Sequence, residues 1–246
     1  QTISGAMWAV CQGAGGVRGI PLPTTLGMHW IARAACELLP ASLGEAVRVG
    51  VVRRHPGGAA AGGWRIVGGL GGYKVVDGAV TGLAVLVMAV MVPLPGPAAG
   101  LRWTAVAAMA VLLVLGAAWH LGAGRRLAGL VPRRARAAAR GLGDGAAVLT
   151  DGPASRTAAT LGLLALVARL LSLTALLLAL GAPPQAAALA FCVIVLAGAI
   201  PGAPGGAGAR EVVLIPALAL AHGVPTTTAL AFSLAVQVTA LATSLA

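Results

Sequence analysis

The sequence predicts an all-α integral membrane protein, a polytopic helical bundle that contains broken or re-entrant helices. Three observations predict this fold class. Hydrophobic residues make up 59% of the 246 residues and charged residues only 9%, whereas soluble domains carry about 25% charged residues. Long apolar runs alternate with short polar segments. Two of those segments combine glycine and proline with arginine and glutamate.

Five apolar runs are long enough to cross the roughly 30 Å hydrocarbon layer of a bilayer. They lack polar faces at the helical period, which argues against the buried helices of a soluble protein. The runs cover residues 79–94, 103–121, 157–180, 185–200 and 226–246. We therefore expect a multi-pass protein of the cell membrane.

Basic residues are concentrated in two stretches of the chain. Twelve of the 17 lysines and arginines fall within residues 48–74 and 122–156, and the net charge is +11. Such stretches are typical of cytoplasmic loops, which contact anionic lipid headgroups. We expect the loops 45–78 and 122–156 to be cytoplasmic and to bind anionic headgroups. A nucleic-acid partner is not expected, because no aromatic-rich platform or helix-turn-helix accompanies the charge.

The cysteines and histidines predict no disulfide framework, metal site or cofactor. The three cysteines are scattered in mostly apolar surroundings, and the four histidines lack ligand spacing. We expect residues 1–246 to form a single transmembrane domain. Because the chain begins with Gln1 and shows no cleavable signal peptide, we expect it to be the N-terminally truncated part of a longer protein.

The segment "PGAPGGAGARE" at 201–211 predicts a re-entrant or broken helix. The apolar stretch that follows has 11 residues before Gly223, which is about half a bilayer at 1.5 Å per residue. We expect Pro216 to interrupt it. Irregular backbone at this depth must be packed in protein or line a polar cavity. The segment "ELLPASLGEAVR" at 37–48 has a similar arrangement. Interrupted helices at corresponding positions in the two halves of a transporter indicate its binding site. One interpretation of the two segments is therefore an internal repeat.

The second interruption supplies groups that suit an anion. Amides of Gly205, Gly206 and Gly208 at a helix start would bind a lipid phosphate, with Arg210 adding charge. Glu211 would pair with an arginine or help to move a proton. In the alternative interpretation the glycines only permit close helix packing, and Glu211 stabilises the start of its own helix.

Arg169 lies midway along the apolar run 157–180, on a stripe with Gly162, Ala165 and Ser172. An arginine at mid-depth faces protein or water and needs a partner, for which Glu211 and Glu37 are available. Either a functional group or a structural ion pair fits this pattern. In the last apolar run, a polar stripe is expected to join helices; it consists of Ser233, Gln237 and Ser244.

The known signatures of enzymes are missing, so we do not expect an enzyme. "GGLGGYK" at 68–74 lacks the Gly-Lys-Ser/Thr order of a phosphate-binding loop. Gly141, Gly143 and Ala146 fit a dinucleotide motif only formally, since they follow an arginine run instead of a strand.

Three segments resemble one known family, the lysylphosphatidylglycerol synthase transmembrane region, also called the flippase-like domain family. "LLPASLGEAVR" at 38–48 is similar to its Leu-Pro-x-x-x-Gly-Glu-x-x-Arg segment. "IPGAPGGAGAREVVLIPAL" with "HGVP" at 200–225 resembles its Pro-x-x-Gly-Gly-x-Gly-x-Arg-Glu segment and the turn after it. "KVVD" at 74–77 resembles an Arg-x-x-Asp with Lys74 in place of arginine. The similarity covers about residues 30–246.

The resemblance implies a multi-pass protein that handles lipids with bulky headgroups, such as aminoacylated phosphatidylglycerol or polyprenyl-linked sugars. Glu37 stands where the family usually has asparagine, and Gln237 where arginine is common. No soluble aminoacyltransferase domain fits in this length, so the resemblance does not imply synthase activity. By position, it implicates Pro40, Gly44, Glu45, Arg48, Asp77, Gly206, Gly208, Arg210 and Glu211.

Our hypothesis is that the two interrupted helices meet and form a polar cavity through which a headgroup crosses the bilayer. Arg48, Arg210 and the glycines at 205–208 would contact phosphate, while Glu45, Glu211 and Arg169 would balance charge or respond to protons. Two alternatives remain. The protein binds lipid as the scaffold of a membrane glycosyltransferase or aminoacyltransferase, or it is itself a membrane-embedded transferase that depends on Glu45 or Glu211.

Overall fold

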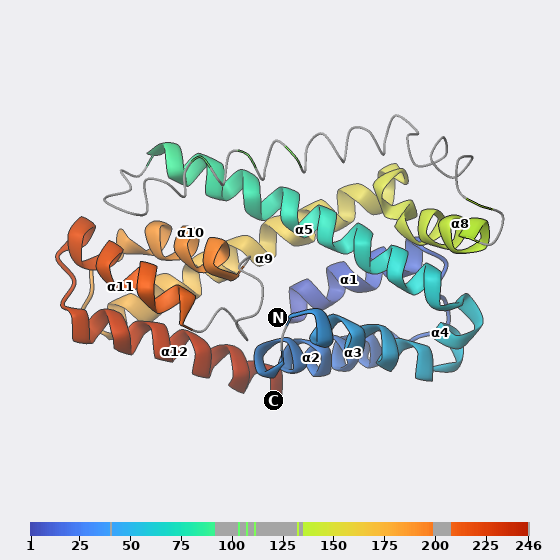
Figure 1. Ribbon diagram of the computed structural model, residues 1–246, viewed down its shortest axis with the longest axis horizontal. Helices are drawn as coiled ribbons and strands as arrows, with labels where there is room; N and C mark the ends of the chain where they lie inside the picture. The colour runs from blue at the N-terminus through green and yellow to red at the C-terminus, as the bar shows by residue number, and fades with distance from the viewer. Residues whose placement is uncertain are drawn as a thin grey trace. The chain divides into compact units, whose positions relative to one another are not determined.

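The computed structural model describes residues 1–39, 41–91, 135–198 and 208–245, together with residues 103, 107, 111 and 132. Every regular element in these ranges is a helix (Figure 1). The predicted all-α fold is therefore confirmed for this part of the chain. Several of our predictions lie outside the described residues, among them those on Pro40, Gly205 and Gly206, on most of the apolar run 103–121, and on most of residues 122–134 of the second basic stretch.

Three described helices are long and apolar enough to cross a membrane. They are Gly63–Met88 within α5 (Gly63–Met91), α9 (Gly152–Ala179), and Thr226–Thr243 within α12 (Thr226–Leu245). Only 17% of the apolar window of α9 is buried inside the protein. Exposed leucines and valines run along these helices, as is required where lipid is the solvent. The predicted membrane protein is confirmed.

The stretch 45–78 is not the irregular loop that we predicted, because most of it is helical, and its cytoplasmic location stays a prediction. It contains most of α3 (Ala41–Arg54), the short helix α4 (Pro56–Ala61) and the first half of α5. Two basic residues that suggested a loop are neutralised within the fold: Arg65 pairs with Asp144, and Lys74 pairs with Glu45. Cations that are paired with carboxylates can lie on a helix near the membrane. The number of basic residues alone therefore placed the start of the helix α5 too late in the sequence.

The predicted loop 122–156 was also wrong where it is described. Residues 135–156 hold α8 (Arg136–Gly145), the 3₁₀ helix η2 (Ala146–Leu149) and the first turn of α9. Asp151 caps α9 by accepting a hydrogen bond from the Ala154 amide at 3.3 Å. The run 185–200 contains α10 (Ala186–Gly198), whose described 13 residues are too short to cross a bilayer.

The predicted half-length helix is present as α11 (Ala209–His222). It starts after Gly208 at φ 81° and ends before Gly223 at φ 63°, and glycine adopts both conformations without strain. Its 14 residues span about 21 Å at 1.5 Å per residue. The expected break at Pro216 was wrong, because this proline lies inside a continuous helix.

The chain divides into two compact units. Unit 1 comprises Gln1–Ala32, Glu45–Val80 and Ala110–Ala165, and unit 2 comprises Arg33–Gly44, Thr81–Met109 and Leu166–Ala246. The long helices α5 and α9 contribute to both, so neither unit is a continuous piece of chain.

Each unit has its own apolar core. In unit 1, α1 (Thr2–Ala14), α2 (Leu22–Leu38), α3 and α5 bury Met7, Trp8, Met28, Val52 and Ile66. In unit 2, α10, α11 and α12 pack side by side over Leu189, Leu214, Leu218 and Phe232 (Figure 1). These two cores position the charged residues that the sequence analysis singled out.

Candidate functional site

A cluster of charged side chains joins α3 and α5 in unit 1. The Glu45 Oε1 atom lies 2.5 Å from Lys74 Nζ, and its Oε2 atom lies 3.4 Å from Arg48 Nη1. Lys74 is half exposed, whereas Arg48 is only 2% exposed. The Glu45 carboxylate therefore contacts two cations, Lys74 at the surface and Arg48 inside unit 1.

Arg48 is held between two aromatic rings. Its guanidinium carbon lies 5.6 Å from the ring centroid of Trp8 on α1 and 5.5 Å from that of Tyr73 on α5. His29 on α2 stands 5.8 Å from Trp8 and 6.2 Å from Tyr73, measured between ring centroids. Four helices thus contribute one residue each to this arrangement. Cation–π contacts stabilise a desolvated arginine but do not use its N–H groups.

Several polar atoms of this cluster have no hydrogen-bond partner among the described residues. They are Arg48 Nε, Arg48 Nη1 and Glu45 Oε2. The 3.4 Å approach of Arg48 to Glu45 is an ion pair without hydrogen-bond geometry. Buried donors of a cation are costly when unmatched, so Arg48 is ready to accept an additional anionic partner.

A cavity of about 150 Å³ adjoins the cluster within unit 1. Trp8, Gln12 and Thr25 line it together with apolar residues, among them Val52, one turn beyond Arg48 on α3. An engineered cavity of this volume in another protein admits benzene. The cavity is therefore smaller than a bulky lipid headgroup.

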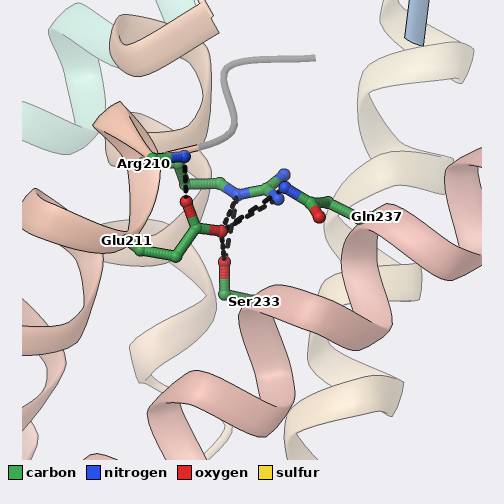
Figure 2. A network of polar contacts seen from close by, with 5 residues as sticks. Arg210, Glu211, Ser233 and Gln237 are labelled. Atoms are coloured by element: carbon green, nitrogen blue, oxygen red, sulfur yellow. Dashed lines mark hydrogen bonds and ion pairs between the residues drawn. The ribbon is translucent and has the colours of Figure 1, made fainter. Parts of the chain in front are cut away.

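A second polar network joins α11 to α12 in unit 2 (Figure 2). Arg210 donates from Nε to Ser233 Oγ at 3.1 Å and from Nη2 to Glu211 Oε1 at 3.2 Å. Ser233 donates to the same carboxylate oxygen at 2.6 Å, and Gln237 Nε2 donates to it at 3.5 Å. Figure 2 shows the Glu211 carboxylate at the centre of these contacts.

Glu211 also caps its own helix. Its Oε2 atom accepts a hydrogen bond from the Gly208 amide at 2.6 Å, which satisfies one of the free donors at the helix start. Burial alone raises the pKa of this carboxyl. Hydrogen bonds from Ser233 and from backbone amides, together with the charge of Arg210, outweigh burial, so the net pKa lies below its usual range. Glu211 is therefore ionised at neutral pH, which favours charge balance over proton transfer.

The comparison with known families agrees with the motifs of both clusters. The model of the lysylphosphatidylglycerol synthase transmembrane region matches residues 3–246. The chain belongs to this family. No curated protein and no solved structure matches the chain significantly.

The charged residues of the two family motifs lie in different units of this protein. Glu45 and Arg48 lie in unit 1 with Asp77, which is half buried one turn beyond Tyr73 on α5. Gly208, Arg210 and Glu211 lie in unit 2. The hypothesis that the two motifs meet around one cavity stays a prediction. Both described motifs do occur near the start of a 14-residue helix, α3 and α11.

The family motif glycine Gly44 has a packing role. A Cβ atom at this position would lie 2.5 Å from Cys36 Sγ, 2.6 Å from Cys36 Cα and 2.8 Å from Cys36 N. Helices α2 and α3 therefore approach each other too closely here for any side chain.

Gly44→Ala is expected to destabilise the protein by about 1–3 kcal/mol, as overpacking does. Gly50→Ala on the same helix is the matched control, since a Cβ there meets nothing within 4 Å. Alanine favours helix, so the control is expected to be neutral or stabilising. Thermal unfolding in detergent measures both, and equal midpoints for the two variants would contradict the packing role.

Glu37 and Glu211, the two carboxylates that we considered as partners of Arg169, each form an ion pair with another arginine. Glu37 pairs with Arg33 at 2.9 Å, and Glu211 pairs with Arg210. Arg169 itself is half buried in α9. Gly162 and Ala165 of its stripe face protein, whereas Ser172 is exposed and bonds the Ala168 carbonyl. The expected stripe therefore covers only the part of α9 before Arg169.

Sequence reasoning missed the aromatic residues around Arg48. Trp8 lies 40 positions from Arg48 and outside the quoted motifs, so no local pattern connects them. Tyr73 is the single tyrosine of the chain and directly precedes Lys74, which was the available signal. Among the described residues, no group of three histidines, cysteines or carboxylates could hold a metal ion.

Proposed function

We propose that this protein binds lipids with bulky polar headgroups and moves the headgroup across the bilayer. The observation that carries the proposal is Arg48, a buried arginine whose Nε and Nη1 donors have no acceptor among the described residues. A lipid phosphate supplies such acceptors, and charge-assisted hydrogen bonds of this kind are strong. The family relationship supports lipid handling as the general role.

In the proposed mechanism the phosphate contacts Arg48 while Trp8 and Tyr73 hold the guanidinium in place. Glu45 remains paired with Lys74, so the phosphate supplies a second anion for the two cations that share Glu45. The adjoining cavity must widen to admit a bulky headgroup, because it holds only about 150 Å³. The acyl chains stay in the bilayer along the exposed apolar faces of α5 and α9.

We assign the phosphate contact to Arg48 in preference to Arg210. The Arg210 donors are directed at Glu211 and Ser233, so this arginine already has acceptors. The role proposed for Arg210 and Glu211 is to fasten α11 to α12. The two family motifs thus have separate roles, with ligand binding in unit 1 and positioning in unit 2.

The test uses purified protein in vesicles with fluorescent lipids that carry either an aminoacylated phosphatidylglycerol or a polyprenyl phosphate sugar. Arg48→Gln is expected to slow transbilayer movement at least about tenfold, since a charged hydrogen bond contributes about 1.5–3 kcal/mol. Arg33→Gln is the control, because Arg33 is 45% exposed and lies in unit 2, whereas the Arg48 cluster lies in unit 1.

Unchanged movement in Arg48→Gln would overturn the assignment of this residue. If the wild-type protein moves neither lipid but co-purifies with a membrane transferase, the scaffold alternative replaces transport. Product formation by the protein alone, lost in Glu45→Gln, would instead identify a transferase. The lipid that moves faster identifies the headgroup class.

A further inference from the structure

Helix α8 is fixed closely against the first turns of α5 within unit 1. A Cβ at Gly141 would lie 2.8 Å from Trp64 Cβ, and one at Gly145 would lie 2.8 Å from Gly68 Cα. A Cβ at Gly68 would likewise meet the Leu142 carbonyl oxygen. Glycines on both helices thus allow contact between backbones, as in closely packed membrane helices.

The start of α5 sets the depth of α8 in the membrane. Gly63 is the first residue of a segment that is long and apolar enough to cross a membrane, and Trp64 follows it with 55% of its surface exposed. Tryptophan prefers the boundary between lipid and water. Because α8 packs on this turn, we expect it at the level of the headgroups.

The outer face of α8 carries positive charge. Arg136 and Arg140 are exposed and lie four residues apart, so they share one face of the helix. The next position on that face is Asp144, which pairs with Arg65 of α5 at 2.9 Å. Asp144 is thus matched by Arg65, and Arg136 and Arg140 place two guanidinium groups on the same exposed face of α8.

We propose that Arg136, Arg140 and Trp64 form a binding surface for anionic lipid headgroups of the surrounding bilayer. The phosphate groups of anionic lipids contact the two arginines, while the indole of Trp64 lies among the glycerol groups. Charge complementarity at headgroup depth selects this partner. The surface anchors the start of α5, and it is separate from the Arg48 cluster to which the proposed function assigns transport.

The test measures the thermal midpoint of purified protein in phosphatidylcholine nanodiscs with increasing phosphatidylglycerol. The wild-type midpoint is expected to rise with phosphatidylglycerol, and the rise is expected to shrink at high salt. In Arg136→Gln/Arg140→Gln, the apparent affinity for phosphatidylglycerol is expected to fall about 25-fold, since each arginine near an anionic surface contributes about a factor of five.

Arg136→Lys/Arg140→Lys keeps the charge and is expected to keep most of the response. Arg33→Gln, which changes a 45% exposed arginine of unit 2, is expected to respond like the wild type. An unaltered response in the double glutamine variant would overturn the proposal. So would a wild-type midpoint that is insensitive to phosphatidylglycerol. Lipid movement is not the readout, so these outcomes are independent of the Arg48 experiment.

Discussion

Glu211→Gln is expected to lower the free energy of unfolding by about 2–3 kcal/mol. Removing one partner of a fully buried ion pair costs about 3–5 kcal/mol, and the 20% exposure of the Glu211 side chain reduces this cost. The substitution leaves Arg210, which is 4% exposed, without its counter-charge. It also places an amide donor among the donors of Arg210 and Gln237. Thermal unfolding in detergent should show a midpoint lower by roughly 5–10 °C.

The double variant Arg210→Gln/Glu211→Gln provides the control for this effect. Two neutral amides can bond each other and Ser233, so no buried charge remains uncompensated. We expect the double variant to be more stable than Glu211→Gln, as removal of both ions often costs less than removal of one. Additive losses would show that the two side chains do not act as a pair.

The pH dependence of the wild type should agree with this structural role. The pKa of Glu211 is lower in the folded protein than in the unfolded chain. Its contribution to stability is therefore present above the unfolded pKa and is lost as the pH falls through the folded pKa. Titration around neutral pH should leave this contribution unchanged, whereas strong acid should remove it. A loss near neutral pH in the wild type, absent from the double variant, would contradict this assignment.

Local patterns predicted the α11 region well. Gly208, Gly223 and the short apolar segment between them are a contiguous signal, and the structure confirms a half-length helix there. The polar stripe of α12 was expected to join helices, and Ser233 and Gln237 do bond to Glu211 of α11. In each case the deciding residues lie close together in the sequence or recur at the helical period.

The predictions that failed depended on pairing between distant segments. The stretch 45–78 looked like a loop because we counted its basic residues without knowing their partners. One of them, Arg65, donates a hydrogen bond to Asp144, which lies 79 positions away in the sequence. The glycines at 68–72 matched no phosphate-binding loop, and the sequence offered no other role for them; in the structure Gly68 and Gly72 give room to α8 and to Val148. A single sequence contains no information on such partners, so helix boundaries and the aromatic enclosure of Arg48 were not predictable.

Arg48→Met is expected to separate stability from function, with a result opposite to that of Glu211→Gln. Arg48 is buried with two unmatched donors, so replacing it with an apolar side chain of similar length removes a desolvation cost. The loss of two cation–π contacts offsets part of that gain. We expect the free energy of unfolding to change by no more than about 1 kcal/mol, in either direction, because Glu45 keeps Lys74 as its partner.

Lipid movement by Arg48→Met in vesicles is nevertheless expected to fall roughly 10- to 100-fold, which corresponds to one lost charged hydrogen bond. Arg48→Lys keeps the charge but has a compact ammonium that does not stack as guanidinium does, so it should recover only part of the rate. A variant that folds as well as the wild type and binds lipid poorly identifies Arg48 as a ligand group. A strongly destabilised Arg48→Met would instead mean that the guanidinium is needed to hold α1, α3 and α5 together, and the phosphate contact would have to be sought elsewhere.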